Sequence, residues 1–393
     1  MALLPLAEAQ TRLLALAGPV AAETVPLAEA AGRWLAADVI AARTQPSSDL
    51  SAMDGYAIRF ADMPGPWAVI GESAAGLGFA GALNAGEAVR IFTGAPLPSG
   101  ADTVLVQEEA AREGDRLLLA GEGPAHQGRN TRRRGLDFHE GAALLSAGDL
   151  MTPARLALAG AAGYAELPVR RRVRVALAAT GNELVLPGQP VGPSQLPETN
   201  RLMLIAQLAG LPVEIVDLGI LPDDFAVLER AFREVEADLL VTSGGASVGD
   251  HDLVRPALEA AGATIDFWRI ALRPGKPMMA GKRGAMLVLG LPGNPVSAFV
   301  TAHLFVRPLV AHLAGASAPF PRTRSVPLGA PLPANGARTD YLRAELRDGQ
   351  AFAAARQDSG MLSTLARATC LIVRPVLAPA LAAGNSVEIL DLA

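Results

Sequence analysis

The chain has 393 residues, of which 50% are hydrophobic, 19% are charged and 4% are aromatic. This length exceeds one ordinary core and predicts about two to four domains, with little disorder and with interiors built mainly from Ala, Val and Leu. The formal net charge of -5 argues against a protein whose main task is to grip nucleic-acid phosphates.

The first 132 residues divide into a helical stretch and an extended stretch. Apolar residues recur at helical spacing over 7–16 and 27–42, which predicts two short amphipathic helices. A loop signal at 46–49 then indicates a boundary near residue 43. Beyond it, short extended runs alternate with Gly- and Pro-rich turns, so we expect a small β domain. Its strands are expected at 67–70, 88–92, 103–107 and 116–119.

An arginine tract at 129–134 follows the expected β domain. In isolation it would suggest a nucleic-acid patch, but three consecutive arginines are more often a solvated surface or an anion site. Together with the net charge, this leads us to expect no nucleic-acid partner. A helix is predicted from Thr152 to Gly163, because Thr152 suits the N-cap and Pro153 the first helical position.

The segment from 173 to 289 alternates apolar runs of strand length with helical patterns, which predicts a parallel sheet with helices on both faces. A long helix is expected over 296–313, and from about 319 short strands return and predict a second, C-terminal β domain. The expected central strands are 173–180, 213–220, 238–242, 264–270 and 285–289, the helices 200–209, 223–235 and 252–261, and the C-terminal strands 341–346, 371–373 and 387–390.

Compartment and membrane association follow from three features. The uncharged stretch 284–306 is long enough for a membrane span, but its Pro-Gly-Asn-Pro centre would break a helix, so we interpret it as a buried strand, a turn and a helix. The single Cys370 can form neither an internal disulfide nor a thiolate metal site. The N-terminus lacks the basic run of a signal peptide. We therefore expect a cytoplasmic protein without a membrane partner.

Small residues, carboxylates and a lysine follow the predicted strands, where ligands of open parallel sheets bind. Glu183, Asp223 and Asp252 are candidate Mg²⁺ ligands, although the two aspartates are equally explained as helix N-caps. The glycine-rich turn 243–249 could cradle phosphate, or its glycines could simply permit a tight turn. Lys276, on a rigid Pro-Gly loop, would hold a phosphate as a point charge, with a solvated loop lysine as the alternative.

Six motifs link these positions to one family. They are SAMDGYA at 51–57, TGAP at 93–96, TGNEL at 180–184, SGG with SVG within 243–249, PGKP at 274–277 and LPGNP at 291–295. Each motif is weak alone, but in this order they resemble the molybdopterin molybdenumtransferases, the family that includes the gephyrin E domain. The resemblance covers nearly the whole chain.

The resemblance implies an α/β multidomain fold with a central parallel-sheet molybdopterin-binding domain, two small β domains and an elongated segment. It implies a homodimer, with a cleft between the α/β domain of one subunit and the small β domain of the other. The expected domains are an elongated dimerisation domain at 1–42 and 133–167, a small β domain at 43–132, a molybdopterin-binding domain at 168–318 and a C-terminal β-barrel-like domain at 319–393.

The implied reaction converts adenylylated molybdopterin and molybdate into molybdenum cofactor and AMP, with Mg²⁺ or a similar divalent cation. A molybdopterin adenylyltransferase and molybdoenzymes are the further partners to expect. Catalytic roles are implied for Asp54, Thr93, Asp137, Glu183, Asp223 and Asp252, of which Glu183, Asp223 and Asp252 would hold the metal. Substrate contacts are expected from Ser243, Gly244, Gly245, Ser247, Arg269, Arg273, Lys276, Pro292, Asn294 and Pro295.

The chain departs from the family pattern at Ser47 and Ser48 before the Asp54 motif, and at Arg269 and Arg273, where many members carry lysine. Either arginine is a more natural partner for anionic molybdate than a carboxylate. The sequence Glu-Thr-Asn at 198–200 replaces the commoner Asp-Ser-Asn. No departure removes an implied catalytic carboxylate.

Two other functions were weighed. A molybdopterin adenylyltransferase would share the α/β domain, but the flanking β domains and the Asp54 motif argue against it. A non-catalytic scaffold of the gephyrin E-domain type is the other alternative, and the sequence shows no receptor-binding feature that would favour it.

Overall fold

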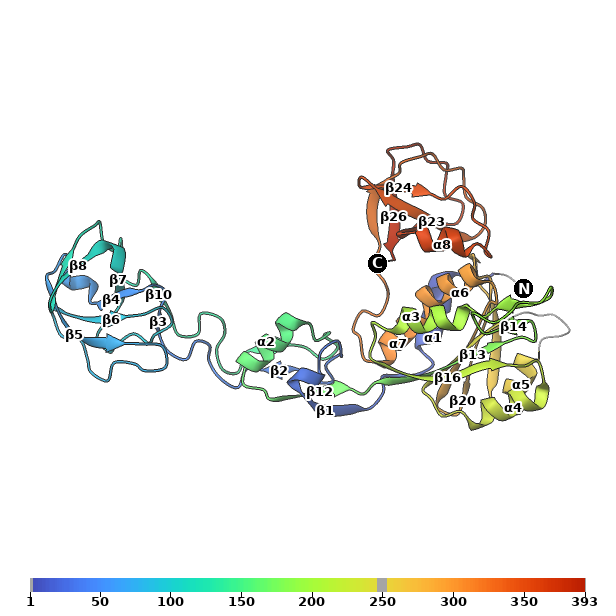
Figure 1. Ribbon diagram of the computed structural model, residues 1–393, viewed down its shortest axis with the longest axis horizontal. Helices are drawn as coiled ribbons and strands as arrows, with labels where there is room; N and C mark the ends of the chain where they lie inside the picture. Colours follow the sequence, from blue (N-terminus) through green and yellow to red (C-terminus); the bar gives the residue numbers. More distant parts are fainter. Residues whose placement is uncertain (1–2, 246–252, 393) are drawn as a thin grey trace.

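The computed structural model describes residues 3–245 and 253–392 and shows an elongated molecule (Figure 1). A small β domain lies at one end and a narrow middle segment follows it. The α/β domain and the C-terminal β domain lie together at the other end (Figure 1).

The narrow middle segment is built from two distant stretches of sequence. Strand β1 (Ala22–Pro26) pairs antiparallel with β12 (Glu166–Arg170), and β2 (Val39–Ile40) pairs with β11 (Ala143–Leu145). Helix α2 (Pro153–Ala161) begins as predicted, because the Thr152 hydroxyl accepts a hydrogen bond from the backbone N–H of Arg155.

The helix expected over 27–42 is wrong. Only a short 3-10 turn, η1 (Leu27–Glu29), forms there, and β2 ends the stretch. Gly32 has a φ of 70°, which a right-handed helix does not tolerate, and Trp34 and Leu35 form bridges to Leu150 and Val169 instead. The spacing of apolar residues in this stretch therefore serves a small core between irregular segments.

The small β domain is a six-stranded sheet in the order β7-β4-β6-β5-β9-β8, and the four strands expected there are confirmed. Strand β4 was not expected. It lies so close to β7 that a Cβ on Gly55 would be 2.0 Å from the Leu105 carbonyl oxygen, so only glycine fits. The elements are β3 (Leu50–Ser51), β4 (Gly55–Ile58), η2 (Phe60–Asp62), β5 (Trp67–Ser73), β6 (Glu87–Ile91), β7 (Thr103–Val106), η3 (Gln107–Glu109), β8 (Ala110–Glu113), β9 (Arg116–Leu119) and β10 (Thr131–Arg132).

The central sheet has the order β16-β13-β17-β21-β20-β18 and carries helices on both faces, as expected. Helices α3 and α6 pack on one face and α4 and α5 on the other. The elements are β13 (Val173–Thr180), β14 (Leu184–Val185), β15 (Leu196–Pro197), α3 (Asn200–Leu208), β16 (Val213–Leu221), α4 (Phe225–Glu234), β17 (Leu239–Ser243), α5 (Val254–Ala260), β18 (Thr264–Arg269), β20 (Pro277–Arg283) and β21 (Met286–Leu291).

The expectation of a wholly parallel sheet is wrong at one strand. Strand β20, which the sequence reading missed, pairs antiparallel with both β18 and β21. The connections on either side of β20 are too short for a crossover helix, so the chain must reverse. The other five strands run in one direction, and their carboxyl ends therefore still meet at one edge.

The stretch Pro295–Leu313 is long and apolar enough to cross a membrane, but 78% of its most apolar 18-residue window is buried inside the protein. It packs on the central sheet as a core helix, together with α1 (Leu6–Leu14), which confirms the predicted N-terminal helix. Part of the 1–42 segment thus belongs to the α/β core. The long helix comprises α6 (Pro295–Thr301), a π-helical turn η4 (Ala302–Val306) and α7 (Arg307–Leu313).

The C-terminal β domain contains the three strands expected from the sequence. Strand β19, which belongs to the chain of the α/β domain, pairs with β23 and so joins the two domains. The elements are β19 (Leu272–Arg273), β22 (Arg324–Pro327), β23 (Thr339–Arg347), β24 (Gln350–Ala353), α8 (Leu362–Arg367), β25 (Cys370–Arg374) and β26 (Ser386–Asp391).

Candidate active site

A cavity of about 470 Å³ lies at the carboxyl edge of the central sheet. Its walls come from the ends of β13, β17 and β21, from the start of α3 and from the loop before α8 of the C-terminal domain. This is the place where open α/β sheets bind their ligands. The predicted site residues that line it are Glu183, Ser243, Gly244, Asn294 and Pro295.

The floor of this cavity is a close contact between strand ends. Gly244 has a φ of 97°, and a Cβ there would lie 2.8 Å from the carbonyl oxygen of Thr180. A Cβ on Gly293 would lie 3.8 Å from the Cα of Gly244. The tight-turn explanation of the glycines therefore holds at Gly244, whose backbone N–H donates to the carbonyl of Leu291 at 3.2 Å.

Asn200, the first residue of α3, connects the two strand ends that form this floor. Its side-chain Nδ2 donates hydrogen bonds to Ser243 Oγ at 2.9 Å and to the carbonyl oxygen of Gly293 at 2.7 Å. Sequence reasoning treated Asn200 only as part of a motif variant. The available signal was its position, because an amide at the start of a helix that begins at the carboxyl edge can reach two strand ends.

Two of the predicted carboxylates lie near each other at this edge. Asp223 accepts a hydrogen bond from the backbone N–H of Asn182 at 3.3 Å and donates its own N–H to Asn182 Oδ1 at 3.1 Å. Glu183 is the next residue along the chain. The cap of α4 is Asp224, which accepts from Val227 N at 2.9 Å, so the N-cap explanation of Asp223 is wrong. Of the two consecutive aspartates, Asp224 caps α4, and the side chain of Asp223 contacts Asn182 instead.

The described residues were expected to contribute to a metal site. Within residues 3–245 and 253–392, no group of three or more His, Cys, Asp or Glu side chains is arranged to hold an ion. Glu183 and Asp223 supply carboxylate oxygens, the ligand type that Mg²⁺ prefers, and substrate phosphates commonly complete such sites. The third expected ligand, Asp252, and the expected substrate residue Ser247 lie outside the described residues.

The basic residues predicted to bind substrate lie in different places. Lys276 lies in the connection between β18 and β20 at the same edge, where a Cβ on Gly275 would be 2.5 Å from Thr301 Cγ2 of α6. The loop that carries Lys276 therefore lies close against α6, and Gly275 leaves the room for this approach. Arg273 instead forms an ion pair with Asp340 of the C-terminal domain, whose side chain is buried. Burial of Asp340 outweighs the pairing and raises its pKa.

Arg273 thus lies away from the cavity that holds Glu183. It lines a separate cavity of about 350 Å³ on the C-terminal domain, next to Asp340. Arg269 is exposed, and its carbonyl accepts a hydrogen bond from Leu4. Pro292 lies in the loop between β21 and α6, directly before the Gly293 that lines the cavity.

Asp54 and Thr93 meet on the small β domain. Asp54 Oδ1 accepts hydrogen bonds from the backbone N–H of Thr93 at 2.7 Å and from its hydroxyl at 2.9 Å. These bonds lower the pKa of Asp54, and the charge of Arg90 adds to the effect. Arg90, which sequence reasoning missed, lies over the rings of Tyr56 and Phe92 at 5.2 and 4.8 Å. The carboxylate of Asp54 is therefore held in place and ionised.

Asp137 lies where the small β domain joins the middle segment. It is exposed, and its backbone N–H donates to the carbonyl of Gln45 at 3.0 Å. Part of the arginine tract has a structural task there, because Asp49 accepts from the side chain of Arg133 and from the backbone of Arg134, both at 2.7 Å. Within one chain, the β domain lies at the far end from the α/β domain, so Asp54 and Thr93 do not share a cavity with Glu183 (Figure 1).

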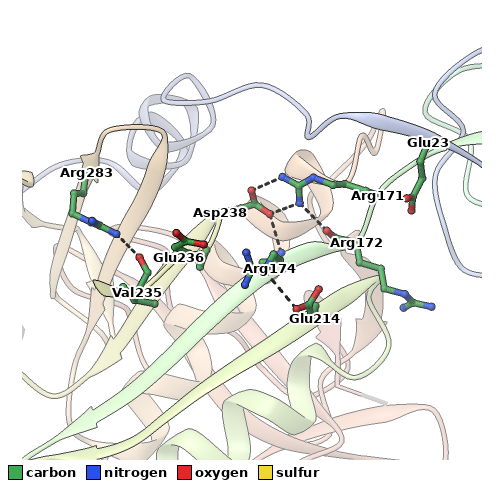
Figure 2. A pocket seen from close by; sticks show the side chains of 10 residues that line it. Glu23, Arg171, Arg172, Arg174, Glu214, Val235, Glu236, Asp238 and Arg283 are labelled. Carbon is green, nitrogen blue, oxygen red and sulfur yellow. Dashed lines mark hydrogen bonds and ion pairs between the residues drawn. The ribbon is translucent and has the colours of Figure 1, made fainter. Parts of the chain in front are cut away.

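A larger cavity, of about 680 Å³, opens at the opposite edge of the sheet and is rich in charge (Figure 2). Several of its charged groups are paired with each other. Arg171 forms two hydrogen bonds of 2.7 Å with the carboxylate of Asp238, which also accepts from the backbone of Arg174 at 2.8 Å, and Arg174 faces Glu214 at 3.5 Å (Figure 2). This cavity lies where the middle segment meets the sheet. The cavity of about 470 Å³ at the carboxyl edge remains the candidate site.

Comparisons with known proteins agree with this geometry. Three family models match the chain: "MoeA N-terminal region (domain I and II)" over 4–163, "Probable molybdopterin binding domain" over 176–312 and "MoeA C-terminal region (domain IV)" over 325–392. A molybdopterin molybdenumtransferase of Haemophilus influenzae is 41% identical over 318 residues, which are 80% of this chain and 78% of that protein.

A molybdopterin molybdenumtransferase 2 of Mycobacterium tuberculosis is 36% identical over 387 residues, which are 94% of this chain and 95% of that protein. Among solved structures, the molybdopterin biosynthesis moeA protein of Pyrococcus horikoshii OT3 superimposes with a TM-score of 0.85 at 28% identity, and the match covers 99% of this chain and 100% of that one.

Proposed function

This chain belongs to the molybdopterin molybdenumtransferase family, and we propose that it inserts molybdate into adenylylated molybdopterin, releasing AMP and forming molybdenum cofactor. The observation that carries the proposal is the cavity at the carboxyl edge of the sheet. Its volume of about 470 Å³ is that of a small-molecule site, and a glycine turn and a carboxylate open into it.

The side chains of this edge have separate tasks in the proposed reaction. The ammonium of Lys276 and the backbone N–H of Gly245, at the end of the described turn, would hold the phosphates of the substrate, while the amide of Asn294 would orient the pterin. Arg269 is the better of the two expected arginines for molybdate, because Arg273 is already paired with Asp340.

Mg²⁺ or a similar divalent cation would be held by Glu183, Asp223 and Asp252, since carboxylate oxygens suit it. When bound, the ion would neutralise charge on the pyrophosphate linkage and improve AMP as a leaving group. Glu183 and Asp223 would keep their positions through Asn182, whose backbone and amide both bond to Asp223.

A homodimer would complete the site. Asp54, Thr93 and Asp137 are not among the residues that line the cavity, and the small β domain lies at the opposite end of the molecule from the α/β domain, so a second copy would have to bring them there (Figure 1). Asp54 would then act as an ionised carboxylate that orients a water molecule or molybdate, since its hydrogen bonds lower its pKa. We infer a cytoplasmic setting, consistent with the single buried cysteine, with substrate supplied by an adenylyltransferase and product taken by molybdoenzymes.

The test is an assay of purified protein with adenylylated molybdopterin, molybdate and Mg²⁺. AMP release that requires molybdate supports the proposal, and a loss of release with chelator supports the metal. A parallel reaction with molybdopterin and ATP tests the adenylyltransferase alternative. Formation of adenylylated product in that second reaction, without release in the first, would overturn the proposed function.

A further inference from the structure

Two turns form the floor of the cavity, and one side chain connects them. The last residue of β17, Ser243, begins the first turn, and the turn after β21 contributes Gly293. Asn200 donates one N–H of its amide to each, at 2.9 and 2.7 Å, and it lines the same cavity. The strands that carry the two segments are paired up to Ser243 and Leu291, and beyond this point a backbone hydrogen bond of 3.2 Å runs from Gly244 N to the carbonyl of Leu291.

The chemistry of these bonds selects an amide at this position. The carbonyl of Gly293 can only accept, so its partner must be a donor. An aspartate of the same shape would put a carboxylate oxygen against that carbonyl oxygen. A leucine or alanine would leave the carbonyl without its donor, and only asparagine has the length of this side chain together with two N–H groups.

The oxygen of the Asn200 amide, unlike its nitrogen, makes no hydrogen bond to the described residues. Asn200 Oδ1 is buried and has no hydrogen-bond partner among the described residues. A buried acceptor without a partner costs about 1–3 kcal/mol in other proteins, so such groups call for a reason. Here the reason is geometric, because both N–H groups are committed and their directions fix where the oxygen points.

We propose that Asn200 is a positioning residue, which holds the Ser243–Gly245 turn and the Gly293–Asn294 turn at one separation. The inference rests on the proposed function for its kinetic meaning, because the turns would hold the phosphates and the pterin of the substrate. Asn200 acts through Ser243 and Gly293 and forms no part of the chemical step.

The experiment compares Asn200→Asp and Asn200→Ala with the matched variant Asn335→Ala. Asn335 makes the same kind of contact elsewhere, because its Nδ2 donates to the carbonyls of Arg338, Arg374 and Pro375 in the C-terminal domain, each at 2.8 Å. Hydrogen exchange of the peptides 239–245 and 286–294 reports on the two turns directly. Molybdate-dependent AMP release gives kcat and KM for adenylylated molybdopterin.

We expect faster exchange in both peptides for the Asn200 variants, and kcat/KM lower by roughly tenfold to a hundredfold, since small misplacements of binding groups have effects of this size. Asn200→Asp should be the worse enzyme, although a carboxylate at the start of α3 favours the helix dipole and keeps the thermal midpoint near that of the wild type. Asn335→Ala should leave exchange in these peptides and kcat/KM unchanged.

Unchanged exchange in both turns would overturn the inference, as would kcat/KM within twofold of wild type for both Asn200 variants. An equal loss of activity and of thermal midpoint in all three variants would also overturn it, because that pattern indicates a general structural role. If wild-type protein releases no AMP, the proposed function fails, while hydrogen exchange still decides whether Asn200 couples the turns.

Discussion

If the active site is shared between subunits, two inactive variants should restore each other. Asp54→Ala removes the carboxylate of the small β domain, and Glu183→Ala removes the carboxylate of the cavity. These residues lie at opposite ends of one chain (Figure 1). Each homodimer of a single variant should therefore carry two damaged sites and release no AMP.

The mixed dimer has a different composition. In one of its sites the intact cavity of the Asp54→Ala chain faces the intact β domain of the Glu183→Ala chain, and its other site carries both changes. Random pairing makes about half of the dimers mixed, each with one working site of two, so activity should reach about a quarter of wild type. Co-expression of both variants and the AMP-release assay measure this value.

The matched control pairs Asp54→Ala with Thr93→Ala. Both changes lie on the β-domain side, where the Thr93 hydroxyl donates to Asp54 Oδ1 at 2.9 Å, so every site of every dimer is damaged and no activity should return. Restoration in the control, or none in the first pair when mixed dimers have been purified with two affinity tags, would refute a site built from two subunits.

Three other expectations follow from single side chains. Gly244→Ala should destabilise the α/β domain by about 1–3 kcal/mol more than Gly262→Ala, because both sites have φ near 90° but only Gly244 would bring its Cβ within 2.8 Å of another residue. Urea-dependent hydrogen exchange of β17 measures this difference, and equal stabilities would contradict the steric argument. Asp223→Ala should abolish AMP release, whereas Asp224→Ala should lose only a helix cap, about 1 kcal/mol of stability, and keep its activity; the opposite pattern in the AMP assay would reverse the assignment. Arg171→Met should lower the thermal midpoint at pH 7, and this deficit should shrink as the pH falls below 3.8, the ordinary pKa of aspartate. Burial opposes ionisation of Asp238, but hydrogen bonds from Arg171 and Arg174 outweigh it and lower its pKa, so its stabilising charge is present above 3.8 and is lost as the pH falls through the lower value of the folded protein. Melting curves from pH 7 to 3 test this, and a constant deficit would show that the charge of Asp238 is not involved.

The sequence predicted the strands of the central sheet well where burial is complete. Residues 173–180 and 238–242 are nearly continuous apolar runs, which a strand buried on both faces requires, and β13 and β17 occupy these places. Because ligands gather at the carboxyl edge of such strands, the positions of Glu183 and Ser243 beside one cavity also followed from pattern.

The failures have local causes. Strand β20 begins with a proline and contains Met-Met-Ala-Gly, which lacks the β-branched residues typical of a strand. Its assignment depends on short connections that only the fold reveals. At 223–224 two consecutive aspartates fit the N-cap pattern equally well, and the first turn of α4 selects the second.

Long-range pairings lie beyond sequence reasoning altogether. Arg273 was expected to contact the substrate because a guanidinium suits anionic molybdate, yet it is paired with Asp340, 67 residues further along the chain. The helix predicted over 27–42 was wrong for a related reason, because Leu35 forms a bridge to Val169 from a distant part of the chain.

The cavity also shows how this fold leaves polar groups unoccupied for a substrate. Structural tasks near the site are carried out by neighbours: Asp224 caps α4, while the carboxylate of Asp223 accepts from the backbone N–H of Asn182, the residue before Glu183. Asn294 stands at the N-cap position of α6, yet its side chain makes no capping bond there and lines the cavity. Asn200 donates a hydrogen bond to Gly293, the residue before Asn294, and so supports the turn that carries the Asn294 amide. A preorganised binding site requires polar side chains that make no local structural bonds, and these must be held in place by neighbouring side chains that do.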